Sequence, residues 1–465
     1  MFHDLKPYPV MKDSGIASLG KIPEHWRVIR TGRLFLEVVD TGHPDLELLS
    51  IDRFRGVIRQ RETGRKERAP EDRSAYKHIR QGELAYNLMN AFMGSIGVSS
   101  FEGILSPAYA VGRPIHPLNA WYYHYLYRTP IYMGEFDRWS YGIMYERNRL
   151  YFDRFKIIPV PYPPVDEQDR IVAFIKQKDA EFRLLISNKR QQIKLLNEQK
   201  QTVIDRAVTR GIDHKARLRP SGIEWLGDLP QHWKLRRLKY LVRNVNDQTE
   251  GKAPDEIYVA LEHIESWTGR LRLPEIEVKF DSLVKRFKPG DILFGKLRPY
   301  LAKVGRPSVQ GVCVGELLVL RPISDDILSE FLEYKLRSNS IINLITSSTF
   351  GAKMPRADWG FMGNMTIAFP PEKTEQWRII SSIQQQTTRF DYSISQALRE
   401  IELIDEYRTS LTVDVVMGKR DVRGLKMPAL QETSEPGLLE EETDKKGLEA
   451  PEELESVEGS FDADE

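Results

Sequence analysis

The sequence predicts an α+β protein with two pseudo-symmetric globular domains separated by two long antiparallel coiled-coil helices. Three observations lead to this fold class. One phrase occurs twice, about half a chain length apart; short strand-like and helix-like runs follow each copy; and a long amphipathic pattern closes each half. Repetition at a fixed offset is the signature of a duplicated structural unit.

The repeated phrase is SGIASLGKIPEHW at residues 14–26 and SGIEWLGDLPQHW at residues 221–233, an offset of 207. Two further pairs recur at an offset of 208: GELAYN at 82–87 with GDILFG at 290–295, and VGRPI at 111–115 with VLRPI at 319–323. The change of offset indicates a single insertion in the second copy, between Trp233 and Gly290.

Each phrase belongs to a region that contains both strand-like and helix-like runs, residues 1–165 in the first copy and 214–371 in the second. Runs such as GVIRQR, IGVSSF and VCVGELLVL predict strands, whereas WYYHYLYR and SEFLEYKLRS predict helices. Each region is therefore predicted to be a compact α+β domain. Trp26 and Trp233, which end the two phrases, are expected to be held in apolar contacts where each domain begins.

A long helix is predicted after each domain, over residues 166–213 and 372–425. A Pro-Pro pair precedes each one and leaves a helix free to begin just after it. Apolar residues then follow spacings of three, four and seven, which mark one stripe along an α-helix. The stripes are Ile171, Ile175, Phe182, Ile186, Ile193, Leu196, Val203 and Ala207, and Ile379, Ile383, Phe390, Ile394, Ile401, Ile404, Leu411 and Val415. A helix of about 40 residues extends about 60 Å, so the two stripes are expected to pack on each other as an antiparallel coiled coil.

Charge is distributed unevenly along the chain. From Pro428 onward there are 14 acidic residues and two lysines, so the rest of the chain carries a net charge of about +13 although the whole has only +1. This excess of cations predicts a polyanionic partner for the body of the protein. The tail, residues 426–465, is predicted to be disordered, and a merely solubilising role for it stays open.

Chain length, cysteine content and the absence of targeting segments indicate the cellular compartment of the protein. A chain of 465 residues is too long for one ordinary domain. The one cysteine, Cys313, excludes an intramolecular disulfide framework and lies in an apolar run, which predicts a buried structural thiol. With neither a signal peptide nor an apolar run of about 20 residues, the protein is expected to be cytoplasmic and to lack a membrane partner.

Several motifs together resemble the specificity subunit of Type I restriction-modification systems. They are the duplicated phrase, KPGDILFGKLRPYLAKVG at 288–305 with IRQGELAYNLMNAFMGSIG at 79–97, the SPAYAVGRP and ELLVLRP runs, and PVPYPPVDEQDRI before the first helix. The resemblance covers residues 11–425. It implies that each globular domain is a target-recognition domain and that the long helices are a spacer between the two.

The same resemblance implies a set of partners. Such a subunit binds double-stranded DNA, two modification (methyltransferase) subunits and two restriction (translocase/nuclease) subunits, and it has no active site or cofactor of its own. S-adenosylmethionine, ATP and magnesium are expected in the partner subunits. Because the two domains differ in sequence, the DNA target is expected to be asymmetric and bipartite, with a gap set by the helices.

Candidate DNA-binding residues are Arg and Lys, which read guanine, and Asn, which reads adenine; those of the second domain lie in or near segments that carry Gly or Pro, and those of the first occupy broadly corresponding places. For each residue alone, contact with a phosphate or with solvent stays open; the cluster is the prediction. The candidates are Asn87, Asn90, Arg147, Asn148 and Arg149 in the first domain, and Lys296, Arg298, Lys303, Lys353 and Arg356 in the second.

The sequence gives little support for chemistry within the chain. GDILFGKL at 290–297 departs from a phosphate-binding loop where Leu297 replaces Ser or Thr. Asp255, Glu277 and Lys279 have the outline of a magnesium-dependent nuclease that acts alone, but the first half lacks it. The nine histidines have no metal-ligand spacing, so neither a metal nor catalytic residues are predicted. A protein-only scaffold is the second alternative.

Overall fold

The computed structural model describes residues 5–53, 55–64, 72–142, 148–273, 283–349 and 354–425. The chain divides into two compact units, one of residues 1–183 with 405–465 and one of residues 184–404. The two longest helices, α4 (Val165–Arg210) and α8 (Lys373–Val416), contribute to both units.

The first unit is built around a four-stranded antiparallel sheet in the order β4-β11-β8-β9, beside the antiparallel pairs β1–β2, β3–β12, β5–β6 and β7–β10. Its strands are β1 (Met11–Asp13), β2 (Lys21–Pro23), β3 (Arg27–Arg30), β4 (Phe35–Val38), β5 (Leu49–Asp52), β6 (Gly56–Arg59), β7 (Lys77–Ile79), β8 (Leu84–Asn87), β9 (Ile96–Val98), β10 (Gly103–Leu105), β11 (Tyr109–Pro114) and β12 (Pro159–Tyr162). Its short helices are α1 (Ala120–Tyr127), α2 (Pro130–Trp139) and α3 (Phe152–Phe155).

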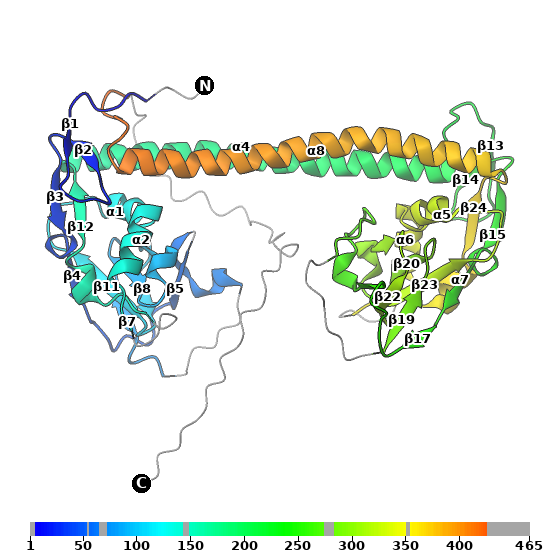
Figure 1. Ribbon diagram of the computed structural model, residues 1–465, viewed down its shortest axis with the longest axis horizontal. Coiled ribbons are helices and arrows are strands. Elements are labelled where there is room, and N and C mark those ends of the chain that lie inside the picture. Colours follow the sequence, from blue (N-terminus) through cyan, green and yellow to red (C-terminus); the bar gives the residue numbers. More distant parts are fainter. Residues whose placement is uncertain are drawn as a thin grey trace, which may run out of the picture. The chain divides into compact units, whose positions relative to one another are not determined.

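The helices α1 and α2 lie beside this sheet (Figure 1), and an aromatic core joins them to it. The buried Phe35 of β4 meets Tyr123 of α1 edge to face, with ring centroids 5.7 Å apart. Tyr122, also buried, donates to the carbonyl oxygen of Val416 in α8 (2.7 Å). The sheet, the short helices and the long helices of this unit therefore share one hydrophobic core.

The second unit repeats the plan with the sheet β16-β23-β20-β21, the pairs β13–β14 and β15–β24, and a second sheet β17-β19-β22-β18. Its strands are β13 (Leu218–Pro220), β14 (Asp228–Pro230), β15 (Lys234–Arg237), β16 (Val242–Val245), β17 (Gln248–Thr249), β18 (Ile257–Val259), β19 (Val284–Phe287), β20 (Ile292–Gly295), β21 (Val304–Gly305), β22 (Gly311–Val314), β23 (Leu317–Pro322) and β24 (Thr366–Phe369). Its short helices are α5 (Ser329–Leu336), α6 (Asn339–Ser347) and α7 (Trp359–Asn364).

The repeated phrase forms the same small hairpin in both units, β1–β2 in the first and β13–β14 in the second. Ser14 N donates to Gly20 O (3.0 Å) just as Ser221 N donates to Gly227 O (3.1 Å). Both glycines have φ of +62°, in the left-handed region that favours glycine over other residues. The recurrence of the glycine therefore follows from the turn that it closes.

In the first unit, the end of the phrase is bonded to the start of α4. Trp26 is buried, and its Nε1 donates to Glu167 Oε1 (3.1 Å). His25 Nε2 donates to the other oxygen of Glu167 (2.7 Å), and the hydroxyl of Tyr8 also donates to this carboxylate. Glu167 lies in the first turn of α4, so the phrase anchors the long helix to the domain.

The second unit contains the same anchor. Trp233 Nε1 donates to Glu375 Oε1 (3.0 Å), and His232 Nε2 donates to Glu375 Oε2 (2.8 Å). Glu375 lies in the first turn of α8 and follows Glu167 by 208 positions. The expectation of buried tryptophans at the domain starts is confirmed, and the polar anchor on each one is an addition to it.

The long helices pair in the antiparallel sense within each unit (Figure 1). In the second unit Lys200 of α4 contacts Asp391 of α8 (2.7 Å), and Lys189 contacts Glu400. Residues nearer the N-terminus of α4 therefore contact residues nearer the C-terminus of α8, which is antiparallel pairing. In the first unit, Arg408 donates two hydrogen bonds to the carboxylate of Asp179, at 2.7 and 3.0 Å.

All sixteen residues of the two predicted apolar stripes are buried or half-buried. α8, however, ends at Val416 rather than at 425. Gly418 has φ of +71°, and Lys419 N donates to Asp414 O (2.8 Å), which is the Schellman arrangement that terminates helices. The predicted fold class, with two similar α+β domains and two long antiparallel helices, is confirmed.

Lys335 makes the stability of the second unit dependent on pH. It is fully buried, and its Nζ donates to Val208 O (2.7 Å) in the last turn of α4. Burial lowers the pKa of Lys335 from 10.5 to about 7, so between these values the unfolded chain binds a proton that the folded unit releases. The free energy of unfolding should therefore rise between pH 7 and 9, by up to about 1.4 kcal/mol per pH unit.

The Lys335→Met variant, which lacks the titrating amine, is the control for this pH dependence of unfolding. Urea unfolding of the full chain at pH 7, 8 and 9 should give a steeper rise for the parent than for the variant. Burial also raises the pKa of Cys313, to about 12, but this group is present in both proteins and cancels in the difference. Equal pH dependence in the two proteins would contradict the role given to Lys335.

Candidate nucleic-acid interface

In the first unit, three segments distant in sequence meet at the end of strand β8. Leu88 N donates to Ala108 O (3.0 Å), and Leu150 N donates to Leu88 O (2.8 Å). Residues 87–90, 106–108 and 148–150 therefore form one group of loops, which we call loop cluster 1.

The second unit forms the equivalent loop cluster 2 from residues 295–301, 315–316 and 354–357. Lys296 N donates to Glu316 O (2.9 Å), and Ala357 N donates to Lys296 O (2.9 Å). These bonds reproduce those of loop cluster 1 at offsets of 207 and 208. The duplicated fold thus builds the same loop framework twice.

Loop cluster 1 contains four of the five predicted residues of the first domain; Arg147 lies outside the described residues. Asn87 Oδ1 accepts from the backbone amides of Met89 and Asn90 (2.9 and 3.3 Å), so this amide holds the turn. Asn90 and Arg149 are exposed, and Asn148 is half-buried.

Loop cluster 2 contains Lys296, Arg298 and Arg356. Arg298 is exposed and has φ of +50°, a region that residues other than glycine seldom occupy. Its backbone amide donates to Pro355 O (2.9 Å), which holds this conformation. The side chain of Arg356 is 56% exposed and contacts the carboxylate of Glu316 (3.3 Å).

The two other predicted DNA-binding residues of the second domain, Lys303 and Lys353, are not found among the described, exposed side chains of loop cluster 2. Lys303 is half-buried, and its Nζ donates to Leu261 O (2.7 Å); burial lowers its pKa. Its ammonium group therefore points into the domain rather than toward a ligand. Lys353 lies outside the described residues.

Arg149 and Arg356 occupy equivalent positions, 207 residues apart. Each lies in a backbone bridge, Tyr141 with Arg149 and Leu297 with Arg356. Around this shared arginine the side chains differ: Asn90 in loop cluster 1 corresponds to Arg298 in loop cluster 2. A shared cation suits contact with a phosphate, and differing neighbours suit different base sequences.

A lysine that bonds backbone carbonyl oxygens supports each loop cluster and was missed by sequence reasoning; Lys77 is half-buried and Lys285 is buried. Lys77 Nζ donates to Tyr109 O (2.6 Å), and its equivalent Lys285 donates to Gly315 O and Leu317 O (3.0 and 2.9 Å). Burial lowers the pKa of both lysines, and the charge of Lys296 lowers that of Lys285 further. Their recurrence 208 positions apart was the available signal.

Exposed aromatic residues beside the clusters were also missed. Tyr141 and Tyr151, both exposed, lie with ring centroids 5.1 Å apart next to Arg149. Tyr300 is exposed two residues after Arg298. Flat apolar surfaces next to arginine can contact sugars and thymine methyl groups.

The other sequence motifs have structural roles where the structure describes them. Residues 292–295 of the phosphate-loop-like segment form β20, and only a short 3-10 helix, Pro299–Leu301, follows. The buried Asp291 accepts two hydrogen bonds from Arg321 (2.8 and 2.7 Å). This arrangement lacks the long helix N-terminus that holds a phosphate in such loops.

The nuclease outline cannot be assembled from the described residues. Asp255 Oδ2 accepts a hydrogen bond from Gln310 Nε2 (2.7 Å). Glu277 and Lys279 lie outside the described residues. Cys313 is buried, as predicted from its apolar surroundings.

None of the helices in the described part of the chain combines the length and apolar character that a membrane span requires.

Comparison with known proteins points to one family. No family model matches the chain. It is 26% identical over 164 residues to the Type I restriction enzyme EcoDI specificity subunit of Escherichia coli, covering 34% of this chain and 36% of that protein. It is 24% identical over 290 residues to the MjaVIII specificity subunit of Methanocaldococcus jannaschii, covering 58% and 64%. The matches thus span less than two thirds of either relative.

A solved structure supports the fold. A chain from a study of complex assembly and conformational transition in the Type I R-M system superposes with a TM-score of 0.60 at 16% identity, covering 85% of this chain and 98% of that one. The HsdS subunit of Thermoanaerobacter tengcongensis gives a TM-score of 0.45 at 18% identity, covering 86% and 98%. The sequence matches are thus to specificity subunits of Type I restriction enzymes, and the structure with the TM-score of 0.60 has the same fold as this chain.

Proposed function

We propose that this chain is the non-catalytic DNA-specificity subunit of a Type I restriction-modification complex in the cytoplasm. The observation that carries the proposal is the pair of loop clusters, which share a backbone framework and one exposed arginine but differ in their other side chains. Residues 1–165 and 214–371 act as two target-recognition domains, one for each half of an asymmetric bipartite target. The α4 and α8 helices are the spacer that sets the gap.

The partners in this proposal are double-stranded DNA, two modification subunits and two restriction subunits. S-adenosylmethionine, ATP and magnesium belong to those subunits, and this chain needs no cofactor for DNA recognition. Large apolar side chains lie exposed along α4 and α8, a feature of surfaces that await a protein partner. In the second unit they include Leu184, Leu195, Tyr392, Leu398 and Leu403.

Sequencing that detects methylated adenine tests this function. Cells that carry the gene with its modification partner should contain a split, asymmetric methylated motif, and deletion of this gene alone should remove it. A catalytically inactive modification subunit is the control and should remove the same motif. Persistence of the motif after deletion, or a symmetric motif, would contradict the proposal.

A separate assay addresses the nuclease alternative. The purified full chain should not cut DNA in the presence of magnesium, because the proposal assigns cleavage to the restriction subunits. Cleavage that Asp255→Ala abolishes would establish the nuclease instead.

A further inference from the structure

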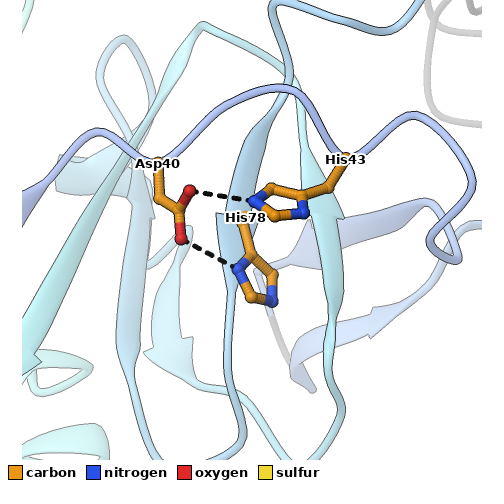
Figure 2. A group of neighbouring side chains, drawn as sticks. All are labelled: Asp40, His43 and His78. Atoms are coloured by element: carbon orange, nitrogen blue, oxygen red, sulfur yellow. Dashed lines mark hydrogen bonds and ion pairs between the residues drawn. The ribbon is translucent and has the colours of Figure 1, made fainter.

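Three polar side chains of the first unit that are scattered in sequence converge in the fold (Figure 2). Asp40 and His43 lie in the loop after β4, and His78 lies in β7. Asp40 Oδ1 is 2.9 Å from His43 Nε2, and Asp40 Oδ2 is 3.1 Å from His78 Nδ1. One atom from each of the three side chains can be chosen so that all lie within 4.8 Å of one another.

The backbone fixes this grouping before any ligand arrives. His78 N donates to Asp40 O (2.6 Å), and Gly42 N donates to Ser74 O (2.9 Å). These bonds hold the loop that carries Asp40 and His43 beside β7. The imidazole rings of His43 and His78 lie with centroids 4.6 Å apart. A site on a fixed frame loses less conformational entropy when it binds an ion.

The hydrogen-bonding capacity of His78 indicates what the cluster binds. Its side chain is only 6% exposed, and both ring nitrogens face carboxylates: Nδ1 faces Asp40, and Nε2 is 2.9 Å from Glu102 Oε1. A neutral imidazole has one N–H and can donate to only one of the two. A cation on Nδ1, whether a proton or a metal ion, satisfies both contacts, because Nε2–H then donates to Glu102; a metal ion can in addition bind the second imidazole, that of His43. With a metal ion on Nδ1, this is the carboxylate–histidine–metal arrangement common in metalloproteins.

We propose that Asp40, His43 and His78 bind one Zn²⁺ ion, with Glu102 orienting His78 from outside the coordination shell. Two imidazole nitrogens and one carboxylate suit zinc, whereas calcium and magnesium prefer sites made of oxygen. Ligand atoms on a tetrahedral zinc lie about 3.3 Å apart, given bonds of about 2.0 Å. The three ligand atoms already lie within 4.8 Å of one another and move closer together when the ion binds, and water completes the shell through the 40% exposed side of His43.

The second unit lacks this site although it keeps the same backbone. Arg286 N donates to Asp247 O (2.8 Å), at the positions equivalent to His78 and Asp40. There His78 is replaced by Arg286, and position 250, which corresponds to His43, is Glu. Arg286 thus removes one of the two imidazole ligands, and Glu250 replaces the other with a carboxylate. Among the described residues, the zinc site therefore belongs to the first unit.

Binding of zinc by the full chain, stripped with EDTA and free of DNA and partners, tests this site. Titration against a chromophoric zinc chelator should show one tight site per chain. His43→Gln and His78→Gln should each weaken binding at least about tenfold, and Glu102→Gln should do so by about 10–100-fold. His116→Gln, which changes an exposed histidine of the same unit, should leave binding unchanged.

Zinc should also raise the melting temperature of the parent more than that of His43→Gln at the same zinc concentration. His43 is partly exposed, so this variant keeps the test decisive if His78→Gln fails to fold. A parent that shows no saturable zinc binding, or equal binding in the His43, His78 and His116 variants, would overturn the site. Because DNA and partners are absent, that result would leave the proposed function untouched.

Discussion

Trp233→Ala is expected to lower the free energy of unfolding of the second unit by about 3–5 kcal/mol, the range for large aromatic residues removed from a core. Trp233 is 2% exposed and packs edge to face on Phe331, with ring centroids 6.2 Å apart. The substitution also removes the hydrogen bond to Glu375, which joins the repeated phrase to α8. Hydrogen exchange in peptides of the second unit, measured on the full chain, should show the loss.

Trp377→Ala is the matched control. Trp377 lies two residues after Glu375 on the same helix but is 50% exposed, so its replacement should change stability by no more than about 0.5 kcal/mol. Trp233→Phe keeps most of the packing and removes the indole N–H, which separates the two contributions. Similar losses in the Trp233 and Trp377 alanine variants would refute the anchoring role.

The long helices could be predicted because their information is local. Apolar residues at spacings of three, four and seven define a face wherever the helix lies, and the stripes from Ile171 and Ile379 are buried or half-buried throughout. The end of α8 was missed because an apolar pattern says little about helix termination. Gly418 was the signal for it, since glycine after the last turn commonly ends a helix.

The anchors on Glu167 and Glu375 could not be predicted from periodicity, because each carboxylate bonds a tryptophan more than 140 positions earlier. Their tertiary partners become visible only when strands and helices are placed. The duplication nevertheless contained a signal: Glu-Gln recurs at 167–168 and 375–376, at the offset of the other repeated features.

The candidate interface was predictable as a region but not residue by residue. Gly and Pro in the sequence located the loops that carry Arg298 and Arg356, and the duplication located the corresponding segment that carries Asn90. The sequence did not reveal that Lys303 would turn inward to Leu261 O, because a long flexible side chain can reach either solvent or a nearby carbonyl. The convergence of His43 with His78 was hidden for a related reason: it depends on how a loop lies beside β7.

Arg149→Ala and Arg356→Ala are each expected to weaken DNA binding by the assembled complex by about 1–3 kcal/mol, or about 5–150-fold. Both arginines are exposed at equivalent positions of the two loop clusters. Fluorescence anisotropy on a duplex that carries the methylated motif, at several salt concentrations, measures the change. Arg138→Ala, on the exposed side of α2 in the first unit, is the control and should leave affinity unchanged.

The salt dependence separates the two kinds of contact that these arginines can make. If Arg356 binds a phosphate, its removal lowers the salt slope by about one and weakens all sequences alike; if it reads a base, it relaxes one position of the motif. Each domain is proposed to read one half-site. If these arginines read bases, Arg149→Ala and Arg356→Ala should therefore reduce sequence specificity in different halves of the motif. Two variants that leave affinity, slope and motif unchanged would exclude the loop clusters from the DNA interface, even if the chain remained a specificity subunit.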